Sequence, residues 1–140
     1  MRAAAVVTLV GLCLQVGVAL AAAPLSGTYV GSTSQKHPIQ IDVKGGKVVS
    51  IVYGVYYACK PSAIGRPLQR TTVTTPLTIT NGKFGGKVKL PVNGTAISDS
   101  TTLRGTFHGS KVTGTFSELF VAGPIRTCRS GTVSFTASRR

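Results

Sequence analysis

The stretch that decides the fold is LRGTFHGSKVTGTF, residues 103–116, which contains Gly-Thr-Phe twice around the pair Gly109-Ser110. Glycine followed by serine favours a two-residue type II′ turn, because the first central residue of that turn needs a positive φ. The turn predicts a hairpin in which successive side chains point to opposite faces. One face is polar and basic, and the other carries two facing glycines, Gly105 and Gly114, with Leu103, Phe107, Val112 and Phe116.

The facing glycines leave a notch in the apolar face of this hairpin. The notch either lets the sheet coil sharply, as barrel closure requires, or receives a large side chain from across the core. Related patterns occur at Gly27-Thr28-Tyr29 and Gly131-Thr132-Val133. We interpret them as a recurring strand device and not as a binding motif.

A second hairpin is predicted over residues 39–55, around Gly45 and Gly46. A three-residue loop at 44–46 would pair Ile41 with Val49 and Ile39 with Ile51. A two-residue Gly45-Gly46 turn would instead set Ile41 against Ser50 and Lys44 against Lys47. We prefer the first register because it matches apolar side chains with apolar ones.

Turn pairs and alternating residues continue through the rest of the chain. Asn81-Gly82 is a type I′ signal that would pair Ile79 with Phe84. Residues 87–92 alternate, with Val88, Leu90 and Val92 facing inward, and Pro91 favours an edge strand. Residues 60–75 are expected to be irregular. The chain is therefore predicted to be all-β, an antiparallel meander of about 7 to 9 strands that forms a β-sandwich or a partly closed barrel.

The N-terminal segment has a different character. Arg2 precedes an almost wholly apolar run at 3–20, and the small residues at 20–24 resemble a cleavage site. This layout predicts a signal peptide over residues 1–23 that is removed, leaving one β domain at 24–140 with no transmembrane segment. The mature protein is then secreted, either extracellular or associated with the cell envelope.

The mature chain keeps two cysteines, Cys59 and Cys128. Oxidising conditions outside the cell favour a disulfide between them, with two buried free thiols as the alternative. A bridge closing a loop of about 70 residues would stabilise the fold by roughly 4 kcal/mol.

The charge balance is strongly basic, with 16 Lys and Arg against three acids, Asp42, Asp99 and Glu118. Removal of Arg2 leaves about +12 on the mature domain, a charge that favours adsorption to polyanions. Glu118, as a lone glutamate in a basic protein, is expected to be an ion-pair partner. The cations expected to contact a polyanion lie on outward strand positions and near the two cysteines: Arg66, Arg70, Lys87, Lys89, Arg104, Lys111, Arg126 and Arg129.

Groups that could perform catalysis are few. The two histidines, His37 and His108, are not spaced suggestively from any acid, and no nucleophile motif or metal-ligand spacing occurs. We therefore expect a protein that is not an enzyme, with no catalytic residues, no metal site and no cofactor.

Both ends of the domain resemble a group of small secreted bacterial β-rich proteins that are themselves uncharacterised. The opening has Gly27-x-Tyr29-x-Gly31-x-Thr-Ser-Gln and then Pro-Ile, and the ending has Cys128-x-x-Gly131-x-Val-x-Phe-x-Ala. The group commonly has glycine after Ser-Gln, where this chain has Lys36. The resemblance implies export and a β-rich fold, and it implies no activity.

Taken together, these features predict a secreted, non-enzymatic β-domain that binds anionic polymer at the cell envelope. Specific nucleic-acid recognition is not expected, because the tyrosines cluster in a strand that looks buried. One alternative is a small-ligand carrier with an apolar barrel interior lined by Tyr53, Tyr57 and Phe107. Another is a hydrolase with a site based on histidine. The sequence leaves the oligomeric state open.

Overall fold

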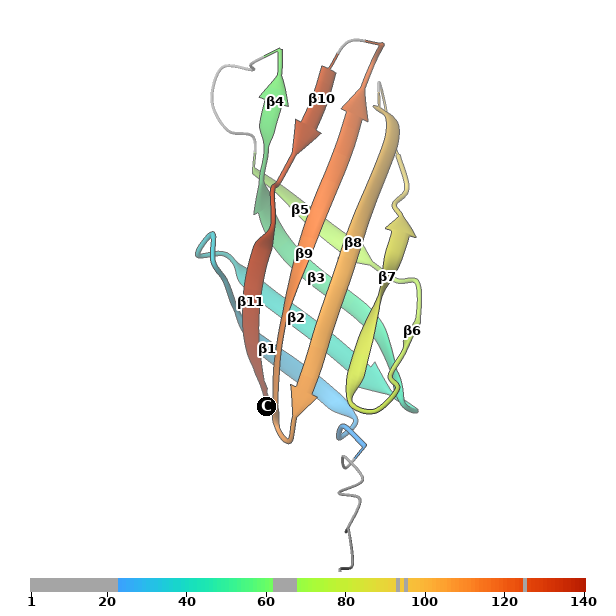
Figure 1. Cartoon of the computed structure of the whole chain (residues 1–140), viewed down its shortest axis with the longest axis vertical. Helices are drawn as coiled ribbons and strands as arrows, with labels where there is room; N and C mark the ends of the chain where they lie inside the picture. The colour runs from blue at the N-terminus through green and yellow to red at the C-terminus, as the bar shows by residue number, and fades with distance from the viewer. Residues whose placement is uncertain (1–22, 62–67, 93, 95, 125) are drawn as a thin grey trace, which may run out of the picture.

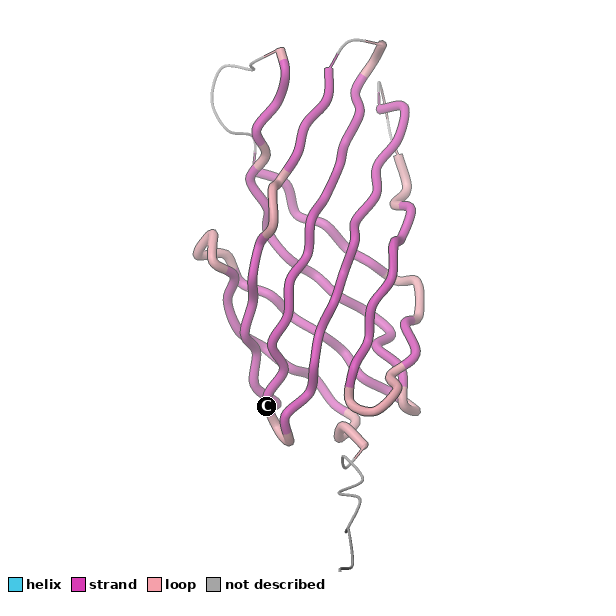
Figure 2. Tube along the Cα trace, in the orientation of Figure 1, coloured by secondary structure: helices cyan, strands magenta, loops and turns pink. Residues whose placement is uncertain are grey.

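The computed structural model describes residues 23–61, 68–92, 94, 96–124 and 126–140. The predicted signal peptide therefore lies, except for Ala23, outside the described residues. The described part contains eleven strands and no helix (Figures 1 and 2). The strands are β1 Gly27–Thr33, β2 Pro38–Lys44, β3 Lys47–Tyr56, β4 Ala58–Lys60, β5 Leu68–Val73, β6 Leu77–Thr78, β7 Lys83–Lys89, β8 Ala96–His108, β9 Lys111–Ala122, β10 Arg126–Arg129 and β11 Val133–Arg139.

All eleven strands belong to one antiparallel sheet that is not closed into a barrel. The path runs β7-β8-β9-β11-β1-β2-β3-β5, with β6 beside the start of β3. The second half of β9 pairs with β10, which pairs with β4. The sheet folds over, so that β7, β8, β9 and β11 cross in front of β1, β2, β3 and β5 (Figure 1). The prediction of an all-β antiparallel fold is confirmed. The structure has more strands than the predicted 7 to 9 because its count includes the short strands β4, β6 and β10.

The β8–β9 hairpin has the predicted register. Phe107 pairs with Val112 and Gly105 with Gly114. Gly109 has φ 60°, as the first position of a type II′ turn requires. The predicted apolar face is buried: the relative exposure is 0% for Leu103, 8% for Phe107, 0% for Val112 and 1% for Phe116.

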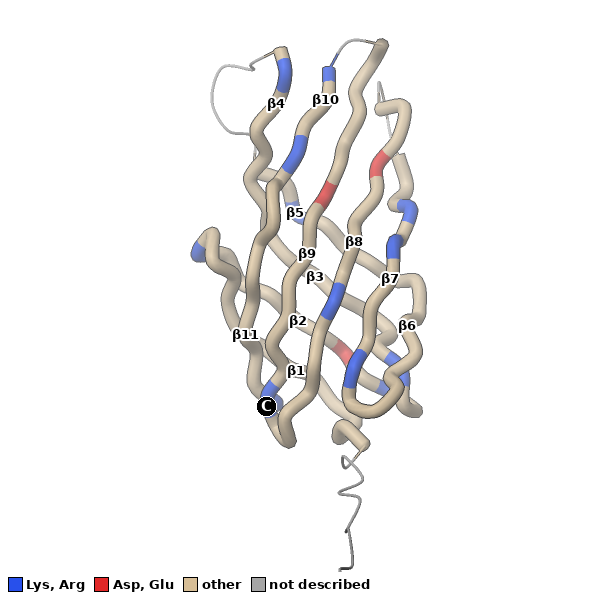
Figure 3. The backbone as a smooth tube through the Cα atoms, in the orientation of Figure 1, with Lys and Arg blue, Asp and Glu red and all other residues tan. Residues whose placement is uncertain are grey.

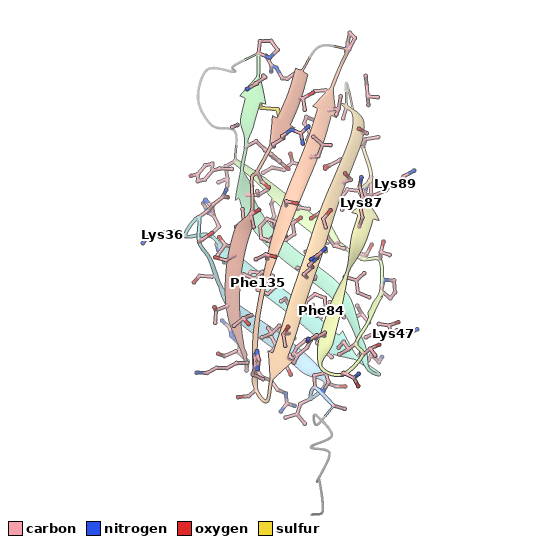
Figure 4. The ribbon with its side chains drawn as sticks, viewed as in Figure 1. Lys36, Lys47, Phe84, Lys87, Lys89 and Phe135 are labelled. Carbon is pink, nitrogen blue, oxygen red and sulfur yellow. A yellow bond between two sulfur atoms is a disulfide. The ribbon has the colours of Figure 1, made fainter. Side chains whose placement is uncertain are left out.

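The glycine notch is filled by two phenyl rings. Phe84 on β7 lies opposite Gly105, and Phe135 on β11 lies opposite Gly114 (Figure 4). A Cβ at either glycine would collide with the corresponding ring. The rings come from neighbouring strands of the same sheet and not from across the core, so each glycine makes room for the aromatic residue beside it.

The predicted register of the β2–β3 hairpin was wrong: Ile41 pairs with Ile51 and not with Val49, and Ile39 pairs with Tyr53 and not with Ile51. Gly45 and Gly46, with φ of 57° and 70°, form a two-residue turn that sets Lys44 against Lys47. Val43 then pairs with Val48 and Asp42 with Ser50, so one residue of β3 is left over as a β-bulge. The bulge restores the match of apolar side chains, because Ile41 now lies opposite Ile51.

The Asn81-Gly82 turn was predicted correctly, whereas the predictions for Val92 and for residues 60–75 were wrong. Asn81 and Gly82 have φ of 51° and 72° and form the predicted type I′ turn, closed by the bridge between Thr80 and Lys83. Val92 was predicted to face inward, but it lies beyond the end of β7 and is 41% exposed. The segment predicted as irregular contains strand β5, in which the buried residues Thr71 and Val73 are separated by the exposed Thr72.

The core lies between the two layers and is closed at one end by the disulfide. Its largest fully buried side chains include Tyr29, Tyr53 and Phe116. Cys59 on β4 and Cys128 on β10 are directly opposite each other and form the predicted bridge. Because β4 follows β3 in the chain, the bridge ties one layer to the strands of the other.

The turn between β1 and β2 contains an unusual backbone conformation. Lys36 has φ 66°, in the left-handed region that favours glycine. The turn therefore keeps a glycine-like geometry with a lysine in it.

Candidate polyanion-binding face

The outward side of β7, β8 and β9 carries cations and hydroxyl groups. Because Phe84 and Val88 of β7 are buried, the lysines that alternate with them point outward: Lys83, Lys87 and Lys89. Arg104 on β8 is exposed and lies opposite Gly85, which has no side chain to displace it. Residues two positions apart on neighbouring strands lie about 7 to 8 Å from each other, so Arg104 is within that reach of Lys83 and Lys87. Figure 3 shows Lys and Arg along these strands.

A hollow of about 360 Å³ lies on this face beside the glycine pair. Lys83 and Arg104 line it together with the hydroxyls of Thr106, Thr113 and Thr115. The threonines come from paired positions, because Thr106 is opposite Thr113 and Arg104 is opposite Thr115. The hollow thus combines two cations with three neutral hydrogen-bonding groups, a chemistry suited to an anionic, hydroxyl-bearing ligand.

A second hollow of about 290 Å³ lies farther along the same strands. Its two cations are Lys87 and Arg129, and its hydroxyls come from Ser100, Thr102, Ser117 and Thr132. The side chains of β8 that line the two hollows are four residues apart, which corresponds to about 13 Å along a strand. We call the two hollows together the basic track: Lys83, Lys87, Ser100, Thr102, Arg104, Thr106, Thr113, Thr115, Ser117, Arg129 and Thr132.

None of the three acids of the chain has an exposed carboxylate on the basic track, although the buried Glu118 is among the residues that line the second hollow. Asp42, on the outer side of β2, accepts hydrogen bonds from Thr28 at 2.7 Å and from Gln40 at 3.2 Å. Asp99 and Glu118 are buried, with 6% and 2% exposure. The cations of the track therefore face solvent without an exposed carboxylate among them, and they produce a positive field over this face.

The two buried acids belong to a polar cluster inside the fold. Glu118 on β9 accepts hydrogen bonds from Tyr53 at 2.7 Å, from Thr71 at 3.0 Å and from Tyr57. Tyr53 has one proton, so the Thr101 hydroxyl, 3.0 Å away, donates to it in turn. The sequence suggested an ion-pair partner for Glu118, but the groups around its carboxylate are hydroxyls.

The cluster shifts the titration of its members. Burial, followed by the charge of Glu118, raises the pKa of Asp99 to about 6. Burial and Glu118 also raise the pKa of Tyr53 and of Tyr57 well above that of an ordinary tyrosine. One oxygen of Asp99, Oδ1, is buried without a hydrogen-bond partner among the described residues. Both observations indicate that Asp99 holds its proton near neutral pH more readily than a surface aspartate does.

The cations named from the sequence do not form one group. Arg104, Lys87 and Arg129 line the basic track, while Lys89 and Lys111 lie on the same outward face beside it. Arg126 begins β10 at the far end, and Arg70 lies on β5 in the other layer. Arg66 is outside the described residues. Lys83 was missed, although its alternation with Phe84 would have placed it on the outward side.

The other residues named from the sequence are the two histidines and the three residues of the carrier interior. His108 is exposed at the β8–β9 turn, and His37 is half-buried beside Tyr56. The residues named for a carrier interior, Tyr53, Tyr57 and Phe107, pack in the core, and the notch beside them holds Phe84 and Phe135. Within the described ranges, no three residues of His, Cys, Asp and Glu are grouped so as to hold a metal ion. The same ranges contain no helix long and apolar enough to cross a membrane.

Comparison with known proteins finds no family model, no curated protein and no solved structure that matches the chain.

Proposed function

We propose that the protein is a secreted β-domain that binds anionic polymer at the cell envelope through the basic track. The observation that carries this proposal is the pair of hollows on one face, each with two cations and several hydroxyls. A single small anion would need only one of them. Two hollows in line suit a polymer whose ionised groups recur along its length.

The side chains of the track suit this task chemically. The guanidinium groups of Arg104 and Arg129 can each hold a carboxylate or phosphate with two parallel hydrogen bonds. The lysines add charge without fixed geometry, and the Thr and Ser hydroxyls can donate to or accept from the hydroxyls of a polysaccharide. Such a surface binds mainly by charge, so its affinity falls as salt rises.

The location rests on the N-terminal pattern and on the resemblance to small secreted proteins. An anionic polymer is available to an exported protein at the cell envelope. The disulfide is consistent with an oxidising compartment. Each of these supports the proposed setting.

The test measures retention on two immobilised polyanions, polygalacturonate and long-chain polyphosphate, as a function of salt. Lys87→Gln combined with Arg104→Gln removes one cation from each hollow. We expect this double variant to bind at least about 10-fold more weakly and to show a shallower salt dependence, by about two charges. The matched control is Lys36→Gln with Lys47→Gln, which removes the same charge at exposed positions in the β1–β2 turn and at the start of β3, neither of which lines a hollow of the track (Figure 4).

The control variant should lose much less affinity than the track variant. Equal losses would mean that net charge alone attracts the polymer and that the track has no special role. Absence of binding to both polymers at low salt would refute the function.

A further inference from the structure

The outward side of the other layer contains a groove of a different kind. Its volume is about 480 Å³, and it lies over β1, β2, β3 and β5. Gly54 contributes to the hollow because it carries no side chain where its neighbours do, with Arg70 directly opposite on β5. The volume is within the range of pockets that hold small molecules, about 300 to 1,000 Å³.

The lining of this groove is largely apolar. Val30 and Val52 form a row with Gln40 between them, because Gln40 pairs with both. Pro38 and Leu68 add further apolar surface, and Leu68 is 55% exposed. Outward positions of a sheet are ordinarily polar, as they are on the basic track, so an apolar hollow here calls for an apolar occupant.

An unsatisfied polar atom belongs to one wall of the groove. His37 lines the groove, and its ring packs edge-on against Tyr56 with 4.6 Å between the ring centres. Its Nε2 atom is buried and has no hydrogen-bond partner among the described residues. A buried nitrogen without a partner costs free energy, so this wall of the groove is less stable than a fully hydrogen-bonded one.

Among the described residues, one cation lines the same groove. Arg70 is exposed, and the three carboxylates of the chain are engaged or buried elsewhere, as described above. A guanidinium is a planar fork that matches one carboxylate. The groove therefore combines an apolar floor with one site for a negative charge, and this combination defines the chemistry of its ligand.

We propose that the groove bounded by His37, Val52, Gly54 and Arg70 binds a small apolar carboxylic acid. The apolar body of the ligand lies on Val30, Val52 and Leu68, and its carboxylate pairs with Arg70. The site is separate from the basic track, because it lies on the opposite layer. It holds one negatively charged group of a ligand, whereas the basic track holds several. It does not depend on the polymer-binding proposal.

The experiment uses decanoate as the probe and decanol as its uncharged counterpart. Binding to the full chain is measured by titration calorimetry, and the site is mapped by amide chemical shifts. We expect saturable binding of decanoate, shifts confined to residues around the groove, and at least about 10-fold weaker binding of decanol. Arg70→Gln should weaken the binding of decanoate by a similar factor, because the carboxylate of decanoate loses its cationic partner.

Two further variants separate filling of the groove from loss of charge. Val52→Phe places a ring in the hollow and should abolish decanoate binding, while Thr136→Phe makes the same change on the exposed side of β11 and should not. Arg104→Gln removes a cation from the basic track and should leave decanoate binding unchanged. Unchanged thermal melting of each variant shows that it folds.

Some results would overturn this proposal. These are the absence of saturable binding, equal weakening by Arg70→Gln and Arg104→Gln, or chemical shifts that cluster on β7, β8 and β9. The polymer proposal is judged separately, because Arg70→Gln should leave retention on polyanions essentially unchanged.

Discussion

The inner and outer sides of β8 and β9 differ sharply, although alternating residues of the same two strands form both. On the inner side, Gly105 and Gly114 are covered by the rings of Phe84 and Phe135. On the outer side, the intervening residues Arg104, Thr106, Thr113 and Thr115 surround an open hollow. Alternation thus separates a side that holds the fold together from a side that is free to bind. Substitutions on the two sides should have very different effects.

The largest effect is expected for Gly114→Val. A Cβ at Gly114 would collide with the ring of Phe135 and the backbone of Arg104, and the backbone of the sheet cannot yield easily. We expect the free energy of unfolding to fall by about 3 kcal/mol. Thr113→Val, one residue away on the outer side, should change it by less than about 0.5 kcal/mol. Urea unfolding of both variants measures the contrast, and similar losses would disprove it.

A smaller loss is expected for Glu118→Gln. The glutamine amide nitrogen cannot accept a hydrogen bond, so at least one of the hydroxyls that contact Glu118 loses its acceptor. The expected cost is about 2 kcal/mol in the free energy of unfolding. Ser117→Ala, the adjacent outward change, should cost far less. A neutral effect of Glu118→Gln would show that the buried network contributes little to stability.

The pH dependence of stability should reveal Asp99. The folded protein binds this proton more tightly than the unfolded chain does, because the pKa is raised to about 6 from an ordinary value of about 3.9. The stabilisation is therefore complete below about pH 4 and is lost as the pH rises through about 6. Asp99→Asn should flatten this decline and raise the stability at pH 7 by about 1 kcal/mol. Chemical denaturation at several pH values tests this. As a control, Lys87→Gln should show the same dependence of unfolding free energy on pH as the parent protein.

The smallest effect is expected at the β1–β2 turn. Lys36 occupies the left-handed region at φ 66°, where glycine has no steric penalty. Lys36→Gly should raise the free energy of unfolding by up to about 1 kcal/mol, since relief of strain is partly offset by the flexibility of glycine in the unfolded chain. Thermal unfolding measures the change. A clear loss of stability would mean that the lysine side chain contributes contacts that outweigh the strain.

The parts of the fold that the sequence predicted are those governed by local rules. Gly109-Ser110 and Asn81-Gly82 specify their turns, and the alternation of Leu103, Phe107, Val112 and Phe116 specifies a buried face. The β2–β3 register could not be predicted, because a bulge resolves the conflict between the preferred turn and the apolar match. Strand β5 was missed because its pairing with β3 depends on the whole sheet.

The candidate sites were predictable only in part. Arg104 and Lys87 could be named as outward cations and Arg129 as a cation near Cys128. Their arrangement with hydroxyls from β8, β9 and the residues before β11 depends on cross-strand register. The groove of the other layer gave no signal, because it depends on Gly54 lying opposite Arg70 and beside His37. Strand pairing over long sequence separations brings these residues together, and no local pattern encodes it.

The carboxylates of Asp99 and Glu118 are buried, and that of Asp42 accepts hydrogen bonds from a hydroxyl and an amide. This affects how copies of the protein meet in solution. Two approaching molecules present lysines and arginines to each other with no acidic patch to form a contact between them. At low ionic strength they should repel one another, and scattering should show a dip at small angles. Salt at about 0.15 M, where the screening length is about 8 Å, should remove it.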